Sequence, residues 1–169
     1  LVKTNTRSQH GGPWAFTLCV ILIVRGTNMG SNERINELAP CGVFCGACPS
    51  FGRSCFGCPS EDQNQKRISK WSCKIRSCCY ENMNLDYCIR CAEFPCERIK
   101  KKLLETHVKD PRYSYRHEVT RIFPKLLELG EEQYYKYQKS RWICPVCEGR
   151  VIFYEYICVD CGLKVISIE

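Results

Sequence analysis

The sequence lacks an apolar run long enough to cross a bilayer, and it lacks two common catalytic motifs. Its most apolar stretch, AFTLCVILIV, occupies only residues 15–24, whereas a transmembrane helix needs about 20 residues. Neither the G-x-x-x-x-G-K-[ST] loop that binds nucleotide phosphates nor the H-E-x-x-H motif of zinc proteases occurs. We therefore expect no association with a membrane and no chemistry of these two types.

Histidine is also scarce, which limits the kind of metal site the chain can build. His10, His107 and His117 are scattered, and none lies near a run of cysteines. Because no C-x2-C…H-x3–5-H spacing includes them, we expect surface residues rather than metal ligands. A β-α-β pattern around a C-x-x-C pair is absent as well, which argues against thioredoxin-type redox exchange.

The N-terminal stretch is the one place where export could be encoded. The apolar run at 15–24 has the length of a signal-peptide core, but Arg25 follows it without an A-x-A-like cleavage site. Met29 then opens a polar stretch shortly before the first cysteine cluster. We interpret residues 1–28 as a disordered extension or a mis-called start, and we expect a cytoplasmic protein.

Cysteine, by contrast, is abundant, with 16 among 169 residues. Eleven fall between 41 and 96, none between 97 and 143, and four between 144 and 161, while Cys19 stands alone. In a secreted protein such cysteines form disulfides, whereas in the cytosol they more often bind metal. The distribution predicts a Cys-rich metal-binding module at 29–98, a helical connector at 99–141 and a zinc ribbon at 142–169.

The formal net charge of +7 treats every cysteine as neutral. A metal-bound cysteine is a thiolate, so a zinc ion held by four cysteines carries a net charge of −2. Three such sites would reduce +7 to about +1. The excess of Lys and Arg therefore gives no independent evidence for nucleic-acid binding.

The pattern of apolar residues predicts a small metal-stabilised α+β fold. The module at 29–98 has few large apolar side chains besides cysteine, so it needs a cross-link or a metal. Helical spacing appears at 96–109, at 117–130 and at 131–142, with Pro124 as an interruption and Gly130 as a stop. The middle run places Val119, Ile122, Phe123, Leu126 and Leu127 on one apolar face. We expect the aromatic residues of 134–142 to pack in the core, and the alternating segments at 150–157 and 163–169 to form strands.

The C-terminal cysteines give the most specific motif. Cys144, Cys147, Cys158 and Cys161 form C-x2-C-x10-C-x2-C, in which two turns at the ends of a hairpin direct four sulfurs to one metal. Four thiolates leave no open position for a substrate, so the motif predicts a structural zinc ion. A rubredoxin-like iron fits the same ligands.

The first module leaves more alternatives open. Its predicted ligands are Cys41, Cys45, Cys48, Cys55, Cys58, Cys73, Cys78, Cys88, Cys91 and Cys96, with one member of the Cys78–Cys79 pair left free. They suffice for two four-thiolate zinc sites, which makes about three zinc ions in the chain. A 4Fe-4S cluster is the alternative, because thiolates bind both. The C-x3-C-x2-C pattern at 41–48 also occurs in radical S-adenosylmethionine enzymes, but the strand–helix alternation of their barrel is absent.

The combined pattern CGVFCGACP…CFGCP…C…C…CIRCAEFPCERI resembles a cysteine-rich prokaryotic family known as domain of unknown function 3795. Longer members continue into a ribbon, as RYSYRHEVTRIFPKLLELG…KSRWICPVCEG…CVDCG does here, so the resemblance covers about 37–163. It implies metal-binding modules, a cytoplasmic setting in bacteria or archaea and an unassigned activity. One departure is Glu148, where ribbons often carry glycine.

Two functions are consistent with these features. The first is a cytoplasmic multi-zinc protein that binds a protein or nucleic-acid partner and has no catalytic residue. The second is an iron–sulfur redox or accessory protein.

Overall fold

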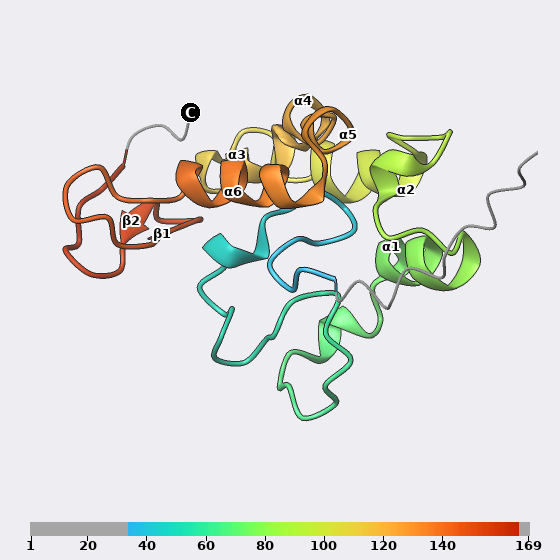
Figure 1. The fold of residues 1–169 in the computed structure, drawn as a ribbon, viewed down its shortest axis with the longest axis horizontal. Coiled ribbons are helices and arrows are strands. Elements are labelled where there is room, and N and C mark those ends of the chain that lie inside the picture. Colours follow the sequence, from blue (N-terminus) through green and yellow to red (C-terminus); the bar gives the residue numbers. More distant parts are fainter. Residues whose placement is uncertain (1–33, 166–169) are drawn as a thin grey trace, which may run out of the picture. The chain divides into compact units, whose positions relative to one another are not determined.

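Short helical segments joined by turns make up most of residues 34–165, the part of the chain that the computed structural model describes. The helices are α1 (Lys74–Ser77), α2 (Glu97–Ile99), α3 (Ser114–His117), α4 (Val119–Ile122), α5 (Lys125–Leu129) and α6 (Glu131–Arg141) (Figure 1). Turns of 3-10 helix lie at Cys45–Ala47, Ile68–Lys70, Cys88–Arg90 and Pro111–Tyr113, and π-helical turns at Cys78–Asn82 and Lys100–Leu104. The strands β1 (Val151–Ile152) and β2 (Ile157–Cys158) pair antiparallel. The fold is therefore a small α+β fold, as predicted.

Helix α6 begins and ends where the sequence indicates. Gly130 precedes it with a φ of +78°, a conformation that glycine adopts without a steric penalty. Two glutamates lie in the first turn and two basic residues, Lys139 and Arg141, in the last, which suits the helix dipole. On its inner side, the Gln138 amide donates to the Tyr134 hydroxyl at 2.6 Å.

Pro124 separates α4 from α5, and this break corrects one prediction. Val119, Ile122, Phe123 and Leu126 are buried as expected, but Leu127 is 56% exposed. The chain passes Pro124 in short i→i+3 turns, with Leu127 N–H donating to the Pro124 carbonyl. The break shifts the phase of α5, so Leu127 points away from the core.

One apolar core joins the connector to both cysteine-rich segments. It contains Phe44 from residues 34–98, Ile99 and Tyr134 from residues 99–141, and Val151 and Phe153 from residues 142–165. We call these ranges the first module, the connector and the ribbon. The expectation that the aromatic residues of α6 belong to the core is confirmed at Tyr134 and at Trp142, which follows the helix.

The hairpin is anchored by aromatic packing and by backbone contacts. The Phe153 ring stacks on Tyr115 with centroids 3.9 Å apart, and the Phe153 N–H donates to the Ala47 carbonyl. Of the predicted second strand at 163–169, the described part contributes one bridge, between Ile157 and Lys164. The predicted extension at 1–28 lies outside the described residues.

None of the described helices has the length and apolarity required to span a membrane.

Candidate metal centres

The four ribbon cysteines bring their sulfurs together at the distances of a tetrahedral metal site. Cys144 Sγ lies 3.7 Å from Cys161 Sγ, and Cys147 Sγ lies 3.4 Å from Cys158 Sγ. All four sulfurs lie within 4.8 Å of one another. A Zn–S bond of about 2.3 Å places tetrahedral ligands roughly 3.8 Å apart, so the donor set fits one thiophilic ion.

Local turns produce this convergence. The Cys144 N–H donates to the Gly149 carbonyl at 2.7 Å, and the Gly162 N–H donates to the Cys158 carbonyl at 3.0 Å. A Cβ at Gly149 would collide with the Asp160 carboxylate and the Cys158 sulfur, so a side chain does not fit there. The unusual Glu148 adopts a left-handed φ of 59°, the conformation that glycine provides in other ribbons.

Hydrogen bonds inside the ribbon stabilise a thiolate at one sulfur. Backbone N–H groups of Cys147 and Val146 lower the pKa of Cys144 to about 7. The Gly149 N–H lowers the pKa of Cys147, but hydrogen bonds with Cys161 and Cys158 outweigh it and raise that pKa to about 12. The four sulfurs thus consist of one favoured thiolate hydrogen-bonded to neighbouring thiols. A metal ion that binds them would take the place of the protons in these hydrogen bonds.

A second gathering of sulfurs, here called the central sulfur group, consists of Cys41, Cys45, Cys58 and Cys73. A hydrogen bond joins Cys45 to Cys58, raising the pKa of Cys45 and lowering that of Cys58 to about 7. Burial, together with the neighbouring Cys58 and Cys73, raises the pKa of Cys41 to about 12. Three separate chain segments therefore bring these four thiols close enough for the charge of one to shift the pKa of another.

Basic side chains surround the central sulfur group. Lys102 Nζ lies 3.5 Å from Cys73 Sγ, and Lys70, Arg76 and Arg67 act on the Cys58 thiol. Arg76 is buried, and its Nε donates to the Cys58 carbonyl at 2.9 Å. These cations would compensate the negative charge of the thiolates if a metal ion were bound there, in line with the charge argument made from composition.

A third gathering surrounds a cavity of about 30 Å³, and we call its sulfur-bearing residues the cavity cysteines. They are Cys78, Cys79, Cys88, Cys91 and Cys96. The other lining residues, Met83, Leu85 and Phe94, are apolar. A hydrogen bond between Cys79 and Cys88 lowers the pKa of Cys79 and raises that of Cys88.

The structure thus groups the predicted ligands unevenly. Among residues 34–165, the ribbon cysteines alone form a set of three or more ligand atoms all within 4.8 Å. Cys48 and Cys55 lie beside Arg67, whose guanidinium contacts Cys48 Sγ at 3.9 Å. None of the fifteen described cysteines is in a disulfide. Cys79, which was left out of the predicted ligands, lies at the cavity beside Cys88.

The described histidines have partners other than cysteine. His107 stacks on Tyr113 with centroids 4.0 Å apart, and His117 Nε2 donates to the Thr106 carbonyl. His10 lies outside the described residues.

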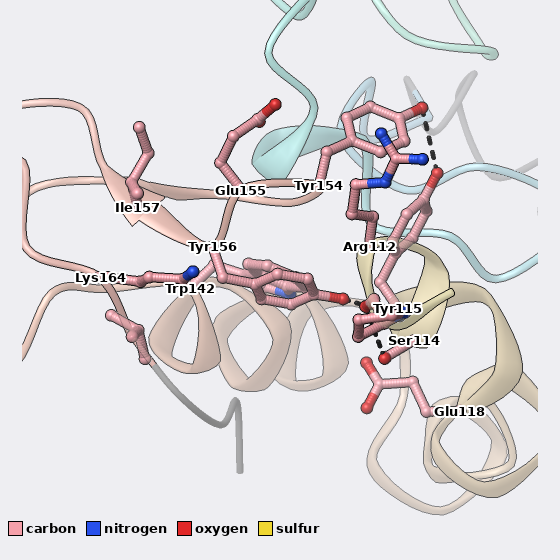
Figure 2. A pocket seen from close by; sticks show the side chains of 12 residues that line it. Arg112, Ser114, Tyr115, Glu118, Trp142, Tyr154, Glu155, Tyr156, Ile157 and Lys164 are labelled. Atoms are coloured by element: carbon pink, nitrogen blue, oxygen red, sulfur yellow. Dashed lines mark hydrogen bonds between the residues drawn. The ribbon is translucent and has the colours of Figure 1, made fainter. Parts of the chain in front are cut away.

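A large open pocket, about 1010 Å³ in volume, lies between the start of α3 and the hairpin (Figure 2). Its wall combines aromatic rings with side chains of both charges, and it contains no cysteine. The Tyr115 hydroxyl donates to the Tyr154 hydroxyl at 3.2 Å, and the Tyr115 N–H donates to the Tyr156 hydroxyl at 3.1 Å. These bonds fix the rings that line it.

Residues 50–101 match the family described as protein of unknown function (DUF3795). The resemblance noted in the sequence is confirmed over this range, which holds the cavity cysteines together with Cys55, Cys58 and Cys73. The loop at 41–48 and the ribbon lie outside the match, so their place in the family stays a prediction. No curated protein and no solved structure matches the chain.

Proposed function

We propose that this protein is a cytoplasmic multi-zinc protein that serves as a binding module, with a structural zinc ion in its ribbon. The observation that carries the proposal is the convergence of four ribbon sulfurs within 4.8 Å. Four thiolates close the coordination shell, so an ion there stabilises the hairpin and presents no open position for a substrate.

Exposed apolar side chains on the ribbon support a binding role. Val146 and Val159 lie within the two cysteine turns, and Ile143 and Leu163 flank them; all four are exposed. A metal ion would fix the two turns that carry or adjoin these residues, and a contiguous apolar surface formed by them would be typical of an interaction site. The partner is a protein or a nucleic acid, and the aromatic pocket of Figure 2 offers it stacking faces and hydroxyl groups.

The first module would hold the remaining metal, which gives about three zinc ions per chain. The central sulfur group supplies four thiols with compensating cations, and the cavity cysteines supply a second set. Zinc requires no redox partner and accepts soft thiolate ligands.

The alternative is an iron–sulfur redox or accessory protein, and one observation favours it for the first module. The sulfurs of the central sulfur group and of the cavity cysteines do not meet the 4.8 Å spacing of the ribbon. A cluster of several irons spreads its cysteines over a larger core than one ion does. Under this alternative the ribbon keeps its single ion.

Metal analysis of anaerobically purified protein tests the proposal. We expect a colourless protein with about three zinc equivalents, and one equivalent lost in Cys161→Ser. Glu148→Gly is the control, because it changes the first cysteine turn of the same site without removing a ligand and should keep full stoichiometry. A brown protein with iron and sulfide would establish the alternative, and a metal-free wild-type chain would refute both.

A further inference from the structure

The cavity cysteines form a compartment that is chemically distinct from the rest of the first module. Five of the eight side chains around the cavity end in sulfur, and the other three are apolar. An apolar cavity of this size normally holds no polar guest, whereas thiolates in such surroundings need a cation to compensate them.

The five cysteines come from three short elements that the chain folds against one another. Cys78 and Cys79 begin a π-helical turn, Cys88 and Cys91 bracket a 3-10 turn, and Cys96 precedes α2. The Cys91 N–H donates to the Cys88 carbonyl at 3.0 Å, which is the tight turn expected of a C-x-x-C pair that shares a metal. π-Helical turns occur often at functional sites.

The adjacent cysteines Cys78 and Cys79 differ in burial and in the groups that they contact. Cys79 is 2% exposed, and its sulfur donates to the carbonyl of Leu85, another residue of the cavity wall, at 3.2 Å. Cys78 also lines the cavity but is only half-buried, and the Arg98 guanidinium donates to its sulfur at 3.0 Å. Cys78 thus already has a cationic partner, whereas the buried Cys79 donates to a neutral carbonyl.

The cavity is large enough for one small guest. Its volume of about 30 Å³ exceeds the roughly 10–15 Å³ that one water molecule needs. A single ion therefore fits that space. The sulfurs are farther apart than in the ribbon, so binding would draw them inward, and Cys79 would give up its hydrogen bond to the Leu85 carbonyl.

We propose that Cys79, Cys88, Cys91 and Cys96 bind one thiophilic divalent ion, zinc by its donor set, and that Cys78 remains outside this centre. The proposal rests on the proposed metal-binding function and makes it specific: it names the ligands of one centre and separates them from the ribbon and the central sulfur group.

Two serine variants of the full chain test the assignment. Cys79→Ser removes a proposed ligand. Cys78→Ser makes the same replacement of sulfur by oxygen at the adjacent cysteine, which is not a proposed ligand. Zinc per chain is measured by elemental analysis, and cobalt(II) is then loaded as a probe, because its thiolate charge-transfer absorption reports bound sulfurs. We expect Cys79→Ser to lose one equivalent and Cys78→Ser to keep the wild-type value.

A third variant separates this site from the ribbon and guards against general unfolding. Cys79→Ser combined with Cys161→Ser should lose two equivalents, and Cys79→Ser alone should keep the ribbon ion. The assignment is overturned if Cys78→Ser loses the ion, if neither variant loses it, or if Cys79→Ser loses all metal. Iron bound by the cavity cysteines of the wild-type chain would refute the assignment of a single zinc ion to them. A wild-type chain without any metal would instead refute the proposed function itself.

Discussion

Removing the ribbon metal should unfold the hairpin while the helices keep their structure. Each strand contributes two residues, joined by the pairs Val151–Cys158 and Ile152–Ile157. A two-stranded hairpin is marginally stable at best in water. The perturbation is a strong chelator under reducing conditions, applied to the full chain, and Cys161→Ser is the variant that affects the ribbon ion alone.

The expected magnitude follows from what else stabilises the ribbon. Within the hairpin at 151–158, the buried apolar side chains apart from cysteine are Val151 and Phe153, and burying such residues contributes about 1.5–3 kcal/mol each. A structural zinc ion contributes about 10–16 kcal/mol at pH 7. The metal therefore outweighs this packing severalfold, and the hairpin should not survive its loss.

Limited proteolysis reports the loss directly. Arg150 and Lys164 are trypsin sites next to the paired residues, and both should become cleavable once metal is removed. Adding zinc back should restore resistance, and the melting temperature should fall on stripping and recover with zinc. Unchanged resistance and an unchanged melting temperature in the stripped protein would refute the reasoning. So would mass spectrometry showing these cysteines as covalent pairs in cells.

Three substitutions test other parts of the structure. Phe153→Ala should cost about 3–5 kcal/mol because it removes a buried, stacked ring, whereas the exposed Leu127→Ala should stay within about 0.5 kcal/mol; equal effects in urea unfolding would contradict the shared core. Gly42→Ala should cost about 1–3 kcal/mol, since a Cβ would overlap a buried aromatic ring, and thermal melting that shows no loss would argue against this packing. Lys102→Met should weaken metal retention by the central sulfur group about 10–100-fold in chelator competition, and Lys101→Met, its exposed neighbour, should not; parallel losses in both would remove the specific role of Lys102.

The features that sequence analysis predicted well are those fixed within a few residues. The four C-terminal cysteines lie on two C-x-x-C turns joined by a hairpin. Their spacing was therefore enough to predict that their sulfurs lie close together. Pro124 and Gly130 act on their own backbone, and both ended helices where expected. The prediction that Leu127 faces the core was wrong because it continued one helical period through Pro124. In the structure, the proline shifts the phase of the next turn.

The features that sequence analysis missed depend on contacts between distant segments. No spacing rule joins Cys45 to Cys58, or Cys73 to Cys41, since the loops between them carry no regular pattern. The choice between Cys78 and Cys79 as a ligand stays a proposal, because adjacent cysteines look equivalent in the sequence and only their surroundings in the fold differ. One available signal was the pair of apolar residues Leu85 and Phe94 close to the later cysteines, which both line the cavity.

The contact between the hairpin and the first cysteine loop has a consequence for how the protein takes up metal. The Phe153 N–H and the Arg150 guanidinium donate to the carbonyls of Ala47 and Gly46, which lie between Cys45 and Cys48. An ion that orders one side of this junction lowers the entropic cost of ordering the other. Metal binding by the first module and metal binding by the ribbon should then be cooperative. A chain cut between the connector and the ribbon would give two pieces that each bind metal more weakly than the whole.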